Sequence, residues 1–112
     1  MWVFFNNAFV SAVAHRDMPD KLMVRARFKG DLERAFGPDI DVLNTPDADY
    51  AYRCVIVREE FVDVLAQAAL NMEYDNFKNS IPQDQKFRKG VYSDVWSVMY
   101  QAQERKSRND LE

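Results

Sequence analysis

Residues 21–28 read KLMVRARF, and the alternation of their side chains decides the fold of this chain. Successive side chains in a β-strand point to opposite faces of the sheet. One set is apolar: Leu22, Val24 and Ala26. The other set is mostly cationic: Lys21, Met23, Arg25 and Arg27. The stretch therefore predicts a strand with one buried face and one face that carries positive charge.

A hairpin is expected before this strand and a short helix after it. Segments 2–5 and 8–14 are rich in aromatic and β-branched residues and are joined by Asn6-Asn7. Asparagine adopts positive φ more readily than most residues, which favours a tight two-residue turn. A helix is expected at 31–36, since Gly30 precedes it and Gly37-Pro38 stops it.

The rest of the chain continues this pattern of strands and helices. Strands are expected at 41–45 and 50–57, and helices at 59–72 and 85–106. The order β-β-β-α-β-β-α-α predicts an α+β fold with an antiparallel or mixed five-stranded sheet and helices on one face, ferredoxin-like in part. We expect one domain over residues 1–110, with Leu111-Glu112 as a cloning remnant.

The apolar faces of these elements give an expected core. Strands supply part of it and the two longer helices supply the rest, because their apolar residues recur at helical spacing. The expected core residues are Leu22, Val24, Ile56, Phe61, Leu65, Val95 and Met99.

The balance of charges argues against some classes of protein. The chain has 15 basic and 18 acidic residues and a net charge of −3, whereas proteins that bind nucleic acid through its phosphates usually carry a basic excess. The apolar run at residues 2–5 is cut short by Asn6-Asn7, so we expect neither a signal peptide nor a membrane span there. A single cysteine cannot form an internal disulfide, and a cytoplasmic location is the expectation.

Conventional catalytic sets are missing from the sequence. One histidine and one cysteine cannot supply the four ligands of a structural zinc site, and the three glycines do not form a phosphate-binding loop. We therefore expect no metal and no cofactor. Cys54 lies in the middle of an expected strand, where a buried, unreactive thiol is the simplest interpretation.

The first candidate site is a ligand-binding set of arginines on the sheet. Strand alternation puts Arg25 and Arg27 on one face, and the same rule puts Arg53 on that face if Cys54 is buried. Guanidinium groups bind carboxylates and phosphates in bidentate fashion. We include His15 as a fourth candidate. A solvated sheet face, balanced by nearby acids, is the alternative interpretation.

The second candidate site is the loop after residue 73. It combines aromatic, amide and cationic side chains without periodicity, which is typical of a recognition loop. Its candidate interaction residues are Tyr74, Asn76, Phe77 and Lys78. The alternative is an ordinary connection anchored by Phe77.

The last helix also suggests self-association. Tyr92, Trp96 and Tyr100 widen its apolar face beyond what a single sheet can easily cover. A homodimer, the commonest way for such a surface to be shared, is expected.

Three stretches resemble a family of short bacterial proteins to which no activity is assigned. They are residues 2–7 (WVFFNN), 24–27 (VRAR) and 75–78 (DNFK). The resemblance spans residues 2 to about 100 and implies a bacterial or phage origin. It implies no catalytic residues.

These observations favour a non-catalytic interaction or regulatory module that binds a protein or an anionic ligand. One alternative is a small metal-free enzyme that acts on an anionic small molecule or a nucleotide, with Arg25, Arg27, His15 and a tyrosine. Another is a phage-encoded inhibitor that binds a host protein through its acidic surface. The sequence alone does not separate these hypotheses.

Overall fold

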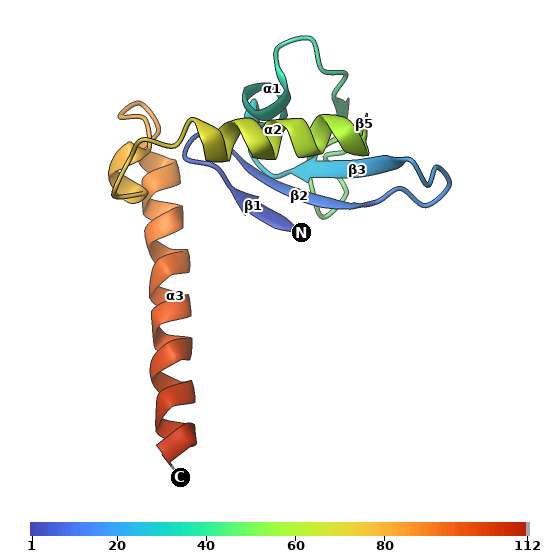
Figure 1. The fold of residues 1–112 in the computed structure, drawn as a ribbon. Helices are drawn as coiled ribbons and strands as arrows, with labels where there is room; N and C mark the ends of the chain where they lie inside the picture. Colours follow the sequence, from blue (N-terminus) through green and yellow to red (C-terminus); the bar gives the residue numbers. More distant parts are fainter. Residues whose placement is uncertain (112) are drawn as a thin grey trace. The chain divides into compact units, whose positions relative to one another are not determined.

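The structure, a computed structural model, describes residues 1–111, which form two compact units that divide between Glu73 and Tyr74. The first unit contains a five-stranded sheet with helices α1 (Asp31–Phe36) and α2 (Arg58–Leu70). The second contains the short helix η1 (Lys78–Ser80) and the long helix α3 (Lys86–Leu111) (Figure 1). The expected α+β class is confirmed. Leu111 ends α3, and Glu112, the second residue of the expected cloning remnant, lies outside the described residues.

The sheet of the first unit is antiparallel throughout. Its strands are β1 (Trp2–Phe4), β2 (Phe9–Ala14), β3 (Lys21–Ala26), β4 (Leu43–Asn44) and β5 (Tyr52–Val57). They lie in the order β1-β2-β3-β5-β4. The sequentially remote strands β3 and β5 are therefore neighbours at the centre, and each pairs over six residues.

One face of this sheet carries the core of the first unit. Val10, Ala12, Val24, Ala26, Cys54 and Ile56 point from the strands into it. Leu32 of α1 (Asp31–Phe36) and Phe61 of α2 (Arg58–Leu70) pack against them, and both helices lie on this side of the sheet (Figure 1). The opposite face receives no helix from the first unit, and we call it the open sheet face.

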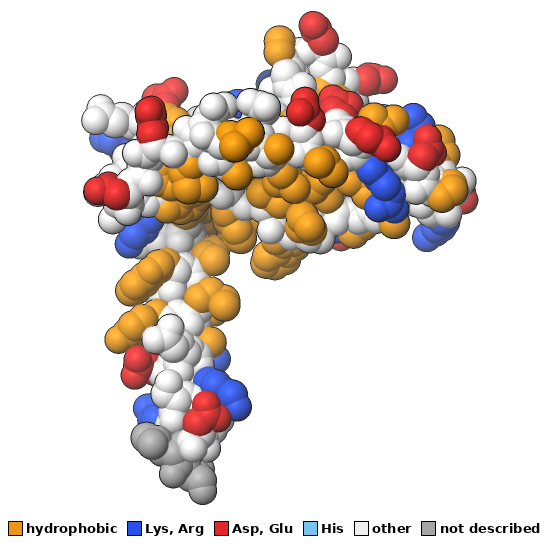
Figure 2. All heavy atoms as spheres, in the orientation of Figure 1, with side chains coloured by type: hydrophobic (Ala, Val, Ile, Leu, Met, Phe, Trp, Pro, Cys, Tyr) orange, Lys and Arg blue, Asp and Glu red, His pale blue; other side chains and the backbone are white. Residues whose placement is uncertain are grey.

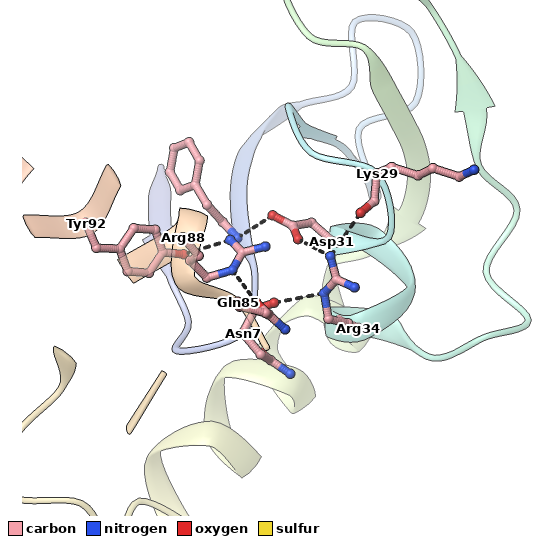
Figure 3. Close-up of polar contacts among 8 residues, drawn as sticks. Asn7, Lys29, Asp31, Arg34, Gln85, Arg88 and Tyr92 are labelled. Atoms are coloured by element: carbon pink, nitrogen blue, oxygen red, sulfur yellow. Dashed lines mark hydrogen bonds and ion pairs between the residues drawn. The ribbon is translucent and has the colours of Figure 1, made fainter. Parts of the chain in front are cut away.

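A buried carboxylate connects α1 to the hairpin of β1 and β2. Asp31 is fully buried, and its Oδ2 accepts a hydrogen bond from the backbone N of Phe9 at 2.9 Å. Arg34 lies 2.9 Å from Asp31 Oδ1 and donates from Nε to the carbonyl of Asn7 (Figure 3). Gly30 has φ of 89°, and a Cβ there would come within 2.8 Å of the Arg34 guanidinium. Glycine thus provides the space for this network.

The turn at Asn6-Asn7 is tight, as expected, but for a different reason. Phe5 N donates to the carbonyl of Ala8 at 2.8 Å, which closes the hairpin. No described residue other than glycine has positive φ, so the proposed backbone conformation of the asparagines is wrong. The bond from Arg34 to Asn7 holds the turn instead.

The last helix departs from the expected core. Val24, Ile56 and Phe61 are buried, and Leu22 and Leu65 pack partly buried against them. Val95 is half-buried outside this cluster, and Met99 is 65% exposed. Its assignment to the core is wrong, because helical periodicity identifies an apolar side of a helix but not what covers that side.

Helix α3 (Lys86–Leu111) is longer than expected. It continues past Lys106, which forms an ion pair with Asp110 at 2.9 Å, one helical turn further on. Such pairs at spacing i,i+4 support an exposed helix modestly. No helix in the described part of the chain combines the length and the apolar character that a membrane crossing requires.

Candidate functional site

A single cross-strand row brings arginines to the centre of the open sheet face. The pairing register joins one residue from every strand: Trp2, Ser11, Arg25, Arg53 and Leu43. Neighbouring strands are about 4.8 Å apart, so the row spans roughly 19 Å. Arg25 and Arg53 lie directly opposite each other in it.

Tyr50 lies beneath two of the arginines, just before β5. Its side chain is on the open sheet face but the residue is only 4% exposed. The Cζ atoms of Arg25 and Arg27 lie 4.5 and 4.1 Å from its ring centroid, within the range of cation–π attraction. The ring therefore gathers side chains whose like charges would otherwise push them apart.

Asp49 supplies oxygen atoms to the arginines from the same turn. Its Oδ1 accepts a hydrogen bond from Arg53 Nη2 at 2.9 Å, and its carbonyl accepts one from Arg27 Nη1 at 2.8 Å. The backbone N of Tyr50 also donates to Asp49 Oδ1. The Asp49 side chain remains 66% exposed. This face thus already holds one carboxylate, at a place that solvent reaches.

Ser11 completes the polar centre from the β2 side. Its Oγ accepts a hydrogen bond from Arg25 Nη2 at 2.8 Å, and the residue is 1% exposed. The buried Nε of Arg25 has no acceptor among the described residues. Such an unpaired buried donor is costly and is often tolerated at functional sites.

The electrostatics of this cluster act on the Tyr50 hydroxyl. A hydrogen bond with the Ser11 side chain is the main cause that lowers the pKa of Tyr50 below its usual value. Burial opposes this change, and the positive charges of Arg27 and Arg25 add to it. The face therefore stabilises negative charge at its centre.

Apolar side chains surround the arginines on this face. Trp2 and Leu43, at the two ends of the row, are each 63% exposed. The next row pairs Val13 with Met23 and Met23 with Val55. Val13 and Val55 are 41% and 40% exposed. We call the open-face residues Trp2, Val13, Met23, Arg25, Arg27, Leu43, Arg53 and Val55 the arginine face.

His15 is not part of the arginine face. It lies in the turn between β2 and β3, where its Nδ1 accepts hydrogen bonds from the backbone N of Asp17 and of Met18. Its position is four residues along the chain from Ser11, or roughly 13 Å on an extended strand. The imidazole therefore shapes the turn.

The loop residues proposed for interaction pack within the second unit. Phe77 lies between two rings, with centroids 5.8 Å from both Tyr74 and Tyr92, and it stacks on Tyr92 at an interplanar angle of 9°. Asn76 Oδ1 accepts a hydrogen bond from the backbone N of Asn79 next to η1 (Lys78–Ser80). Lys78 Nζ lies 4.9 Å from the ring centroid of Trp96. These contacts anchor the loop to α3.

Polar contacts near the start of α3 have a comparable anchoring role. Arg88 is 5% exposed and donates to Gln85 Oε1 and to the Tyr92 hydroxyl (Figure 3).

A hollow of about 570 Å³ beside η1 is lined by Asn79, Ile81, Pro82, Gln83, Lys86 and Lys89. Neither His15 nor an arginine of the arginine face lines it.

Metal ligation and thiol chemistry find no support in the described residues. Among residues 1–111, no group of three or more His, Cys, Asp or Glu side chains could hold a metal ion. Cys54 is 3% exposed on the core side of β5, and burial raises the pKa of its thiol to about 12. A thiol with so high a pKa is a poor nucleophile at neutral pH.

Sequence reasoning missed Tyr50, Asp49 and Ser11 as parts of the arginine face. Tyr50 is expected inside a strand at 50–57, where alternation puts it on the face of Cys54 and Ile56. In the structure β5 begins at Tyr52, and Tyr50 lies on the open sheet face against Arg25 and Arg27. Ser11 could have been found from the hairpin register, because it pairs with Arg25.

Comparison with known proteins adds no relative: no protein-family model, curated protein or solved structure matches this chain.

Proposed function

We propose that this chain is a non-catalytic binding module whose arginine face takes an acidic protein partner. The observation that carries the proposal is the position of Asp49: Arg53 binds its carboxylate and Arg27 binds its backbone carbonyl, with Arg25 beside them. A carboxylate from a partner would meet the same donors, since Asp49 itself is largely exposed.

The arginines keep donors available for a partner. A guanidinium group has five N–H donors. Arg25 and Arg53 each use one side-chain hydrogen bond in the described part of the chain. Charge-assisted bonds from such groups contribute about 1.5–3 kcal/mol each when they are well formed. The Nε of Arg25 is buried, and the guanidinium groups of Arg27 and Arg53 are less so. Arg27 and Arg53 are therefore the primary donors in this proposal.

The apolar surround favours a protein over a free anion. Protein interfaces are enriched in Trp, Met and Arg and depleted in Lys, and Trp and Arg dominate their binding energy. Trp2, Met23 and the arginines give this face that composition. The expected partner therefore presents one or more carboxylates flanked by apolar side chains.

A second copy of the chain does not suit this face. In a two-fold symmetric dimer the same patch meets itself. That arrangement would bring three arginines and one aspartate from each copy into one interface, and the resulting excess of positive charge opposes association. A homodimer, if it forms, uses another surface.

The enzyme hypothesis is less well supported by this geometry. A metal-free reaction on an anionic substrate needs a general base near the arginines, within hydrogen-bond reach of the substrate. His15 is in the β2–β3 turn with Nδ1 engaged by two backbone N–H groups. Tyr50 is buried under the arginines. A phage-encoded inhibitor that binds a host protein through its own acidic surface would use a surface other than the arginine face. A bacterial regulatory module fits a site for an acidic partner.

Chemical-shift mapping tests this proposal. The probe is a synthetic peptide of alternating glutamate and leucine, titrated into the ¹⁵N-labelled full chain at low ionic strength. We expect the largest shifts at Arg27, Arg53 and the Trp2 indole, with weaker shifts at higher salt. Shifts centred on another surface would contradict the proposal. Tighter binding of a single-stranded oligonucleotide than of the peptide would overturn the choice of a protein partner.

A further inference from the structure

Strand β5 has a free edge over its second half. β3 pairs with all six residues of β5 on one side, but β4 pairs on the other side only with Tyr52 and Arg53. The chain before β4 leaves the sheet there, since Ile40 and Val42 pack against the core. In the described part of the chain, residues 54–57 of β5 therefore have no strand beside them on the β4 side.

Strand geometry determines which backbone groups face this edge. Thr45 N donates a hydrogen bond to the carbonyl of Ala51 at 2.7 Å, on the β4 side of the sheet. Successive residues of an antiparallel strand bond alternately to the neighbours on its two sides. The backbone groups of Val55 and Val57 therefore point toward the free edge, whereas the residues between and before them bond to β3.

These backbone groups are unpaired among residues 1–111. The N–H and carbonyl of Val55 and the N–H of Val57 form no hydrogen bond with any described residue. Val55 and Val57 are 40% and 36% exposed, so a partner can reach them. Such an edge is a template for another strand, and natural proteins commonly protect one with Lys or Pro. Residues 54–57 read CVIV and include neither, so this edge is open to pairing.

Arg53 determines which kind of strand the edge favours. A strand added antiparallel to β5 would place one of its residues opposite Val55, with the side chain on the open sheet face. That residue would be diagonal to Arg53, about 7–8 Å away, which is within reach of a long side chain. Arg53 uses one side-chain hydrogen bond, to Asp49, in the described part of the chain. A glutamate opposite Val55 would therefore meet a guanidinium group that still has donors to offer.

The edge at β1 does not offer the same charge. Neither β1 nor β2 contains an arginine, and a strand added beside β1 would lie three strand spacings, roughly 14 Å, from Arg25. A strand added beside β5 is one spacing, roughly 5 Å, from the strand that carries Arg53. Hydrophobic side chains also reach the surface of the first unit over its strands, below α2 in the view of Figure 2. This surface suits a segment in which acidic and apolar residues alternate.

We infer that the acidic partner binds as an added antiparallel strand along residues 54–57 of β5, with a carboxylate opposite Val55 that bonds to Arg53. The inference rests on the proposed function and specifies how the partner is held. Every strand pair of the sheet is antiparallel, which favours that orientation. In strand addition the main-chain bonds supply affinity, and the alternate side chains supply specificity.

Two N-methylated forms of the glutamate–leucine peptide, titrated into the full chain, test this inference. If the glutamates lie on the open sheet face, their amides point toward β5, and the leucine amides point away from it. Methylation of the glutamate amides should weaken binding about tenfold or more, whereas methylation of the same number of leucine amides should change it by roughly twofold at most. The two peptides are matched in charge and in the number of methyl groups, so each is the control for the other.

Amide hydrogen exchange of the ¹⁵N-labelled chain gives a second measurement. Without peptide, the amides of Val55 and Val57 should exchange quickly, and those of Cys54 and Ile56, which bond to β3, should exchange slowly. The unmodified peptide should slow exchange at Val55 and Val57. It should leave the other two amides almost unchanged.

Three outcomes would overturn the inference. The first is equal affinity for the two methylated peptides, and the second is unaltered exchange at Val55 when peptide is bound. The third is a chain that sediments above 13.1 kDa without peptide and already protects the Val55 amide, because a second copy would then occupy the edge. The unmodified peptide should still lose affinity in Arg27→Gln combined with Arg53→Gln. If it does while the methylated peptides bind equally, strand addition is wrong and the arginine face remains the site.

Discussion

Arg25 and Arg53 lie directly opposite each other on the neighbouring strands β3 and β5, on the sheet face without helices from their unit. Like charges in that position destabilise a sheet. Asp49 offsets part of the repulsion, because its Oδ1 accepts a hydrogen bond from Arg53 at 2.9 Å. Local arrangements that oppose stability in this way are expected mainly where a protein binds something.

Asp49 should compete with an acidic partner for Arg53. In Asp49→Asn the amide oxygen can still accept the hydrogen bond from the backbone N of Tyr50, but the negative charge is gone. We expect the variant to bind the glutamate–leucine peptide about three- to tenfold more tightly, a change of about 1 kcal/mol. Isothermal titration calorimetry measures this. Weaker binding by Asp49→Asn would show that Asp49 positions the arginines and does not compete.

Tyr50 should ionise earlier than an ordinary tyrosine. Its pKa is lowered mainly by the hydrogen bond with Ser11 and further by the charges of Arg27 and Arg25. Since the folded state releases this proton before the unfolded state does, the Tyr50 contribution to stability grows as pH rises toward its usual pKa of 10.0. An absorbance titration should lose its earliest phenolate transition in Tyr50→Phe, and Arg27→Gln should move that transition to higher pH. An unchanged curve in both variants would contradict this picture.

The Cys54 thiol should make the fold sensitive to alkaline pH. Burial raises its pKa from 9.0 to about 12, so the unfolded chain ionises while the folded chain keeps the proton. From this thiol alone, the free energy of unfolding falls by up to about 1.4 kcal/mol per pH unit across that interval. Other groups also titrate there, so Cys54→Ala is the reference in urea denaturation. The stability advantage of the wild-type chain over Cys54→Ala should shrink as pH rises above 9. A constant difference would contradict the raised pKa.

Local patterns predicted the elements of the fold more closely than the site. The alternation at 21–28 placed Arg25 on the face opposite Val24, and the glycines around 31–36 gave the bounds of α1. These features depend on neighbours in sequence. Alternation over the expected strand 50–57 puts Tyr50 on the core face, but β5 begins only at Tyr52. Tyr50 lies under Arg25 and Arg27 because the preceding turn folds over the open sheet face. The exposure of Met99 depends on what packs against α3, and the sequence of a single helix does not show this either.

Affinity of the full chain for the glutamate–leucine peptide, compared between matched arginine variants, tests the central claim most directly. In Arg27→Gln combined with Arg53→Gln, we predict at least a tenfold loss of affinity with a free energy of unfolding within about 1 kcal/mol of wild type. Arg16→Gln, in the β2–β3 turn away from the arginine face, should bind like the wild-type chain. A double variant that folds normally and binds as tightly as Arg16→Gln would show that the arginine face is a solvated surface and not a binding site.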